Sequence, residues 1–166
     1  MKNKKEGGVI IKIGVIIEKG GKLLLIKEKS RRDGIYYWNI IKGSFDLKKD
    51  KELMSAAKRE STEEANANIK IKGIANILYL RKKGRLLIQF NFWASLIGSN
   101  FHISPKMEQR KYGEGEDIID AKMFSRKELT AMRRKDFMGV RAYTAIDAWL
   151  KGRWVRKDLI KVLESY

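Results

Sequence analysis

The chain has 166 residues, of which 43% are hydrophobic and 34% charged, as expected of one soluble globular domain with a hydrophobic core. It contains no cysteine and a single histidine, His102, which excludes disulfides, thiolate or multi-histidine zinc sites and a cysteine nucleophile. Its 37 basic and 20 acidic residues leave a net charge of +17, which favours anionic partners such as nucleotides, nucleic acid or anionic lipid.

The first hundred residues have the pattern of strands around one helix. Strands with β-branched, leucine-rich or aromatic sequences are predicted at residues 9–18, 22–29, 35–41, 69–81 and 85–97. Glycine-containing turns at Lys19-Gly20-Gly21 and Lys82-Lys83-Gly84 join the first two and the last two strands as hairpins. A loop from Gly43 leads to a helix predicted from about Lys51 to Ala65, with Asp50 as its N-cap.

The remaining residues are predicted to close the domain. Residues 98–115 form a loop of a length that is often functional, and a last strand follows at 117–124. Ser125 and Glu128 have the spacing of a capping box for a short helix through Met132. Further helices are predicted at 136–150 and 157–163. We therefore expect a single α+β domain over residues 1–166, with a core at about 8–130 and a C-terminal helical extension at about 131–166.

No apolar stretch reaches the roughly 20 residues that a membrane-spanning helix needs. The basic N-terminus and the apolar run after Gly8 resemble a signal peptide, but Lys12 interrupts the run and no small-residue cleavage site follows it. No basic amphipathic terminus stands apart from the domain either. These features predict a cytoplasmic protein without a membrane partner.

The predicted helix carries the main functional signal. One helical spacing runs through three apolar and then three acidic residues, namely Leu53, Ala56, Ala57, Glu60, Glu63 and Glu64. A merely solvated helix would carry its carboxylates opposite the apolar stripe. Carboxylates that converge on a partly buried face repel one another and require cations. A hard divalent ion suits oxygen ligands best, and Mg²⁺ is the usual ion beside phosphates.

Gly43 lies at the end of the aromatic strand, just before the loop that leads into the acidic helix. Glycine there permits a sharp turn and allows a backbone carbonyl to point at a ligand. By itself Gly43 would be interpreted as an ordinary turn glycine. Only the acidic helix that follows supports a role in binding a ligand.

Together these residues resemble the signature of the Nudix (MutT-like) hydrolase family, G-x5-E-x7-R-E-U-x-E-E-x-G-U, where U is aliphatic. Gly43 opens the motif, and Arg59-Glu60-Ser61-Thr62-Glu63-Glu64 matches its R-E-U-x-E-E core in spacing. The flanking strands extend the resemblance over about residues 8–130. It implies a Nudix-like α/β/α sandwich with a mixed sheet, here with appended C-terminal helices.

The sequence departs from this signature at several positions. The segment between Gly43 and the helix is two residues longer, and Lys51 stands at the first glutamate position, where the adjacent Glu52 is a candidate substitute. Three single replacements complete the departures: Ser61 for an aliphatic residue, Asn66 for the closing glycine and Ile41 for a common proline. The three core glutamates are intact, so we expect activity.

The resemblance implies an Mg²⁺-dependent hydrolase, with Mn²⁺ as an alternative ion. Its substrate would be a nucleoside diphosphate linked to another moiety, in the ADP-ribose, dinucleoside polyphosphate or nucleoside triphosphate class. The implied metal ligands are Gly43, through its carbonyl, and Glu60, Glu63 and Glu64. The implied catalytic residues are these three glutamates and Arg59, which braces them.

The general base and the substrate contacts are less defined. Glu60 is one candidate base, and the acids of the later loop are the others, namely Glu114, Glu116 and Asp117. Lys42 is a candidate for binding a substrate phosphate, and Tyr37 for stacking on a base. Trp38 is expected in the core, because alternating strand aromatics usually pack there.

A second hypothesis is a catalytically weak Nudix-like module that binds nucleotide or RNA. The many basic residues between Arg126 and Lys161 are compatible with RNA binding. A solvated basic face explains them too, and we favour that interpretation. A nucleotide is thus the expected partner, whereas RNA and a homodimer are compatible with the sequence and not required by it.

Overall fold

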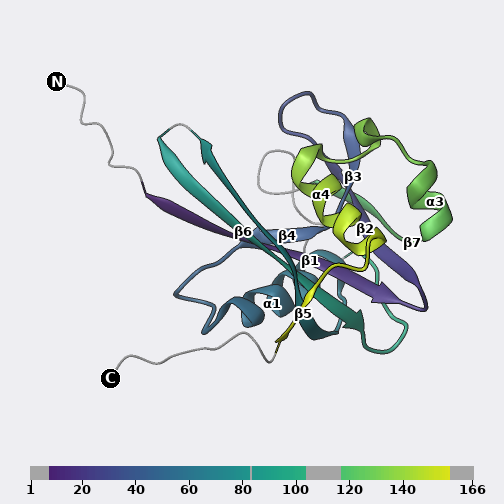
Figure 1. The fold of residues 1–166 in the computed structure, drawn as a ribbon, viewed down its shortest axis with the longest axis horizontal. Coiled ribbons are helices and arrows are strands. Elements are labelled where there is room, and N and C mark those ends of the chain that lie inside the picture. The colour runs from purple at the N-terminus through teal and green to yellow at the C-terminus, as the bar shows by residue number, and fades with distance from the viewer. Residues whose placement is uncertain (1–7, 83, 104–116, 158–166) are drawn as a thin grey trace.

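The computed structural model describes residues 8–82, 84–103 and 117–157, and within these ranges no helix is long and apolar enough to cross a membrane. A sheet lies between two helical layers (Figure 1). The elements in chain order are β1 (Val9–Lys19), β2 (Lys22–Lys29), β3 (Tyr36–Asn39), β4 (Ile41–Ser44), α1 (Leu53–Ala65), β5 (Ile69–Lys82), β6 (Arg85–Leu96), β7 (Ile118–Ser125), α3 (Arg126–Ala131), the 3-10 helix η1 (Arg134–Asp136), α4 (Gly139–Leu150) and β8 (Val155–Arg156).

The sheet is mixed, with strand order β3-β2-β1-β6-β5-β8, while β4 pairs with β1 and β7 with β2. β1 and β6 run parallel along almost their whole length, and the other strand pairs are antiparallel. Both predicted hairpins are confirmed, because Lys19 pairs with Lys22 and Lys82 pairs with Arg85. The predicted fold class, an α/β/α sandwich with C-terminal helices, is therefore correct.

The predicted strand at 35–41 is wrong as a single element, because it is divided at Ile40. β3 pairs with β2, with Trp38 opposite Lys27, whereas β4 pairs with β1, with Gly43 opposite Ile13. Ile40 is buried where the chain changes partner. β2 and β4 share one edge of β1, and local sequence alternation does not report such a change of partner.

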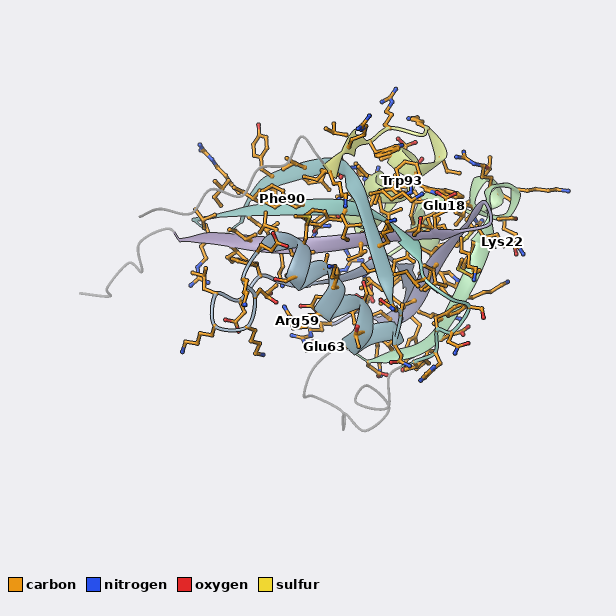
Figure 2. The ribbon with its side chains drawn as sticks, turned by 90° about the horizontal axis from the view of Figure 1, so that it is seen from below. Glu18, Lys22, Arg59, Glu63, Phe90 and Trp93 are labelled. Carbon is orange, nitrogen blue, oxygen red and sulfur yellow. The ribbon has the colours of Figure 1, made fainter. Side chains whose placement is uncertain are left out.

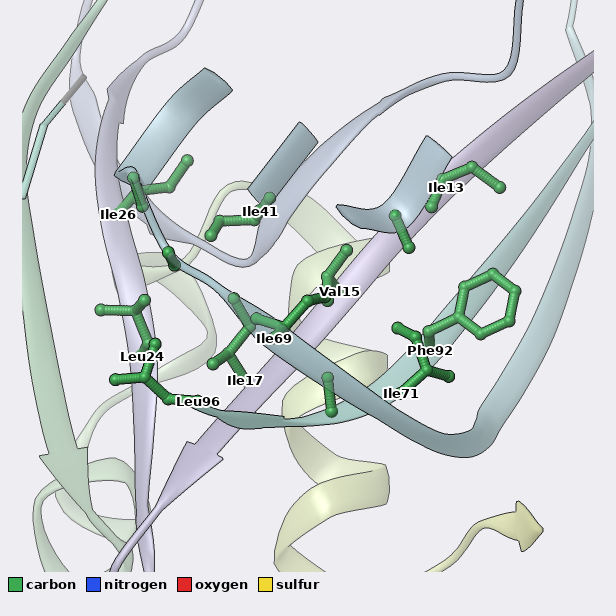
Figure 3. Close-up of a cluster of buried hydrophobic side chains, with 14 of the residues drawn as sticks. Ile13, Val15, Ile17, Leu24, Ile26, Ile41, Ile69, Ile71, Phe92 and Leu96 are labelled. Atoms are coloured by element: carbon green, nitrogen blue, oxygen red, sulfur yellow. The ribbon is translucent and has the colours of Figure 1, made fainter. Parts of the chain in front are cut away.

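One face of the sheet packs against α1. Its core consists mainly of branched aliphatic side chains from β1, β2, β5 and β6, with Phe92 among them (Figure 3). Ala56 and Ala57 of α1 are fully buried against this layer. Their small side chains let the helix approach the sheet closely, which brings the next turn of α1 near β4.

The opposite face packs against α4. Trp149 is fully buried there, and its indole N–H donates to Glu18 Oε2 at 3.1 Å. The indole of Trp93 donates to the same oxygen, also at 3.1 Å. Figure 2 shows Glu18 and Trp93 close together on this side of the sheet. A carboxylate on β1 therefore fixes α4 to the sheet.

The C-terminal elements differ in part from the prediction. The capping box of Ser125 and Glu128 is confirmed at the start of α3. The helix predicted from Asp136 begins instead at Gly139, because Phe137 is buried and bridges to Trp38. The short strand β8 was not predicted, and the helix predicted at 157–163 falls almost entirely outside the described residues.

Candidate active site

Gly43 of β4 lies against the side chain of Glu60 on α1. A Cβ atom added to Gly43 would overlap the carboxylate group of Glu60, so a side chain at this position would require that carboxylate to shift. Gly43 lies within β4 and does not have a positive φ. The prediction that Gly43 forms a sharp turn is therefore wrong. Glycine at this position leaves room for the Glu60 carboxylate.

The glutamates of α1 lie along its buried side, as the apolar stripe indicated. Glu60 is 8% exposed and Glu64 is fully buried, with Ser61 between them also fully buried. Glu63 lies at the margin, with its side chain 34% exposed. Ser61 Oγ donates to the carbonyl of Ala57, four residues earlier. That hydrogen bond satisfies a hydroxyl at a position where the Nudix signature has an aliphatic residue.

Arg59 connects these acidic residues to the preceding loop. Its Nη1 atom donates to Glu60 Oε1 at 2.7 Å and to Glu63 Oε2 at 3.1 Å, and its Nη2 atom donates to the Ser44 carbonyl. Figure 2 shows Arg59 and Glu63 along the same flank of α1. One guanidinium thus binds two carboxylates of the helix and the end of β4.

Asp50 is the main partner of Arg59, and sequence analysis assigned it a different role. Both Asp50 oxygens accept hydrogen bonds from Arg59, from Nε and Nη2, each at 2.8 Å. These bonds hold the pKa of the buried Asp50 below its ordinary value and raise the pKa of Arg59. The N-cap of α1 is Glu52, whose N–H donates to Ser55 Oγ. The predicted Asp50 N-cap is therefore wrong.

A second ion pair lies beside the glutamates. Lys42 Nζ is 3.0 and 2.9 Å from the two carboxylate oxygens of Glu28, and Asn39 donates to the same carboxylate at 2.7 Å. The backbone N–H of Lys42 donates to Glu64 Oε2 at 3.3 Å. Sequence analysis missed Glu28. The sequence signal that could have found Glu28 is its position in the strand, because an acid there continues the alternating inward-facing positions of Leu24 and Ile26.

The other predicted side chains lie farther along the sheet. Tyr37 stands opposite Glu28 in the β2–β3 register, and its hydroxyl donates to Asp33 at 3.2 Å. Asp117 accepts a hydrogen bond from the hydroxyl of Tyr36. The candidate bases Glu114 and Glu116 fall outside the described residues. Trp38 packs edge-on against Phe124, in agreement with the expected core role.

Comparison with solved structures identifies the architecture, although no family model and no curated sequence matches the chain. A Nudix hydrolase from Nitrosomonas europaea superposes with a TM-score of 0.71 over 93% of this chain and 97% of its own, at 20% identity. The MutT protein from Methanosarcina mazei Go1 gives 0.64 over 89% and 97%, at 16% identity.

This chain has the Nudix fold. A third structure, the Nudix domain of Shewanella oneidensis NrtR complexed with ADP ribose, agrees with a TM-score of 0.63 at 12% identity, over 89% of each chain. At such identities the likeness concerns the fold.

The loop before α1, which is longer than in the Nudix signature, supplies an acid to Arg59. Lys51, at the first glutamate position of the signature, is exposed, and the adjacent Glu52 is the N-cap. The carboxylate that pairs with Arg59 comes instead from Asp50. The amide N–H of Asp46 donates to Asp50 Oδ2 at 3.0 Å. The two additional residues are thus part of a loop that places an aspartate on the arginine.

The donor chemistry of this flank of α1 fits a hard divalent cation. Three glutamates and a strand carbonyl supply only oxygen ligands, as Mg²⁺ prefers. Among the residues that the structure describes, however, no three acidic or histidine side chains already have the arrangement of a metal site. Arg59 Nη1 lies between Glu60 and Glu63, so a cation would compete with the guanidinium for both.

Proposed function

We propose that this chain is a divalent-metal-dependent hydrolase of the pyrophosphate linkage in a nucleoside diphosphate joined to another moiety. The observation that carries the proposal is that Glu60 and Glu64 are buried on the side of α1 that faces the sheet, with Glu63 at its margin and Gly43 leaving room for Glu60. The Nudix fold supports it. The substrate class remains that of ADP-ribose, dinucleoside polyphosphates and nucleoside triphosphates.

In this proposal the three glutamates hold Mg²⁺ or Mn²⁺ together with the Gly43 carbonyl. The bound ion supplies neutralisation of the pyrophosphate charge and lowers the pKa of a water molecule. Arg59 orients Glu60 and Glu63, and Asp50 fixes the guanidinium that does so. The backbone N–H of Lys42 orients Glu64. Glu60 and the loop acids remain the candidates for the general base.

Two side chains are assigned to the substrate. Lys42 is proposed to contact a phosphate, which requires its ammonium group to exchange Glu28 for the substrate. Tyr37 is proposed to stack on the base from β3. ADP-containing substrates come first for testing, because a structural neighbour with a TM-score of 0.63 and 18% identity is an ADP compounds hydrolase.

The test is a substrate panel with and without Mg²⁺, with products resolved by chromatography. ADP-ribose, a dinucleoside polyphosphate and nucleoside triphosphates are incubated with the native chain, Glu64→Gln and the control Asp147→Asn, a surface carboxylate of α4. We expect Mg²⁺-dependent cleavage that Glu64→Gln abolishes and Asp147→Asn retains. Cleavage that survives Glu64→Gln would contradict the assignment of this site.

The second candidate function is a nucleotide- or RNA-binding module with weak catalysis. The engagement of both Glu60 and Glu63 by Arg59 favours it, because these carboxylates already have a cationic partner without a metal. Binding of nucleotide in EDTA, together with no turnover on the panel, would support this module and exclude the hydrolase for those substrates.

A further inference from the structure

The outer part of the β5–β6 hairpin extends away from the two helical layers. We call it the hairpin arm and define it as residues 75–82 and 84–90. Figure 1 shows it beside the beginning of β1, and the register pairs Tyr79 with Ile88 on β6 and Leu86 with Val9 on β1. Three strands therefore form a flat extension of the sheet.

One face of the hairpin arm is apolar and open. It continues the sheet face that α1 covers, because Ile77 is opposite Phe90, which packs on the edge of that core. Beyond α1 the cover ends: Ile77 is 54% exposed and Tyr79 is 79% exposed. Val9 on β1 is 59% exposed beside them. An aromatic ring and aliphatic side chains thus lie in contact with solvent on a β surface.

The hairpin arm is also strongly basic. Between Ala65 and Ile103 the sequence contains no aspartate or glutamate, but it contains six lysines and arginines. Four of these six surround the turn, in the sequence Arg81-Lys82-Lys83-Gly84-Arg85. Arg81 and Arg85 are exposed, and neither forms a salt bridge within the part of the chain that the structure describes.

Three basic residues of the C-terminal part provide a contrast. Arg133 lies 3.9 Å from Asp136, and Lys151 lies 2.7 Å from Asp147. Arg126 donates to the last carbonyls of α4. Counter-charges and backbone acceptors therefore stand beside these cations. In the hairpin arm, positive charge and an exposed aromatic ring coincide without an acid nearby in sequence.

We propose that the hairpin arm binds single-stranded nucleic acid, with Tyr79 stacked on a base and Arg81, on the same face, contacting a phosphate. Arg85 is opposite Lys82 beside the turn, on the other face of the arm, and contacts a phosphate where the strand passes round the tip. Unpaired bases offer a π face to an exposed ring, and arginines beside the ring follow the backbone. A duplex hides those faces within its base stack, so a flat sheet surface favours the single strand.

The free edge of β5 distinguishes nucleic acid from a lipid surface. Among the described residues, β8 pairs with β5 only at Gly73 and Ile74, so the edge of the hairpin arm is open. Insertion into lipid would remove water from unpaired backbone N–H and C=O groups, which is costly. Nucleic acid leaves this edge solvated. A second copy of the chain would bring like charges together.

Fluorescence anisotropy of a labelled RNA of about 12 nucleotides, in EDTA and low salt, tests the proposal. EDTA separates it from the proposed hydrolase, which needs metal, so either proposal can fail without the other. We expect Tyr79→Ala to raise the Kd roughly 5- to 100-fold, and Tyr79→Phe to bind like the native chain, because the ring is what stacks. Tyr143→Ala, which removes an exposed ring of α4, is the matched control and should bind normally.

The charge contribution is tested with Arg81→Ala/Arg85→Ala. Between about 50 and about 200 mM salt, the dependence of log Kd on log salt should become shallower by roughly 1.4, which corresponds to two phosphate contacts on a single strand. Lys127→Ala/Lys135→Ala removes two charges elsewhere and should retain the native slope. Circular dichroism confirms that each variant is folded.

The following results would overturn the proposal. They are absence of RNA binding by the native chain at low salt, equal Kd and salt slope for the arm variants and the native chain, and binding of anionic lipid vesicles in place of RNA. A Tyr79→Phe variant as weak as Tyr79→Ala would also overturn it, because the hydroxyl would then carry the contact.

Discussion

At the scale of single residues, Arg59 organises the candidate active site. It pairs with Asp50 on the loop side and with Glu60 and Glu63 on the helix side, and its side chain is only 20% exposed. A partly buried arginine needs such partners, because desolvation penalises an unpaired charge. The carboxylate that fixes Arg59 therefore contributes to stability and positions the glutamates.

Replacement of Asp50 by asparagine should lower the free energy of unfolding at pH 7 by about 2–3 kcal/mol. This loss is smaller than for breaking a fully buried ion pair, because Arg59 retains two other carboxylate partners. The pKa of Asp50 is lowered by folding from its ordinary 3.8. Its contribution is thus present above about pH 4 and is lost as the pH falls through the folded-state pKa.

Urea unfolding of the native chain and Asp50→Asn across an acidic pH series measures this effect. The difference between the two should shrink as the pH falls below about 4. Asp147→Asn, which removes a surface carboxylate, should cost no more than about 1 kcal/mol. A difference between native chain and Asp50→Asn that is independent of pH would show that the charge of Asp50 is not the cause.

Gly43→Ala tests the contact between β4 and α1. The added methyl group must displace Glu60, so we expect a loss of about 1–3 kcal/mol in the free energy of unfolding. Gly8→Ala is the control, because nothing lies within 4 Å of a Cβ at that position. Chemical denaturation compares the two. Equal stability of Gly43→Ala and the native chain would mean that Glu60 can leave without cost.

At the scale of elements, each helical layer is held by a polar contact as well as by apolar packing. α1 is tied to the preceding loop through Arg59, and α4 is tied to β1 through Trp149 and Glu18. The two indole N–H groups satisfy a carboxylate at the interface between β1 and α4. An interface of this kind requires one orientation of the helix, which apolar contacts alone specify less strictly.

Trp149→Phe removes one of these donors and part of a fully buried ring. Hydrogen bonds to charged groups contribute about 1.5–3 kcal/mol, and the smaller ring adds a packing loss. We expect a total loss of about 2–4 kcal/mol in urea unfolding. Trp154→Phe, at a ring that is 41% exposed, should change stability by less than about 1 kcal/mol. Similar losses for both variants would contradict a specific role of Glu18.

At the scale of the whole molecule, the sandwich brings α1 against β4 so that helix carboxylates and a strand backbone meet. If this flank binds Mg²⁺, the folded state gains about 2.7 kcal/mol at an ion concentration of 100 Kd. The melting temperature should then rise by several degrees. Sodium chloride at equal ionic strength controls for screening of the net charge of +17.

Glu60→Gln and Glu64→Gln should lose the Mg²⁺-dependent rise in melting temperature, and Glu128→Gln, on the exposed cap of α3, should retain it. This readout is independent of substrate and of turnover. An equal rise in all variants would place the ion elsewhere on the molecule.

The sequence by itself determined the features that depend on neighbouring residues. The two hairpins, the α3 capping box and the line of glutamates on α1 follow from local turn chemistry and from helical periodicity. These signals lie within a few residues of one another, and they were correct. They also contained enough of the signature to predict the fold.

Only the tertiary structure decided which distant residues meet. It divided the aromatic strand at Ile40, because β2 and β4 share one edge of β1. It paired Arg59 with Asp50 and Lys42 with Glu28. It also showed that the Glu60 carboxylate occupies the space where a side chain at position 43 would lie. Each of these outcomes depends on partners that are brought together by sheet register and helix packing. Local periodicity contains no information about such partners, because it reports which face a residue occupies and not what lies opposite.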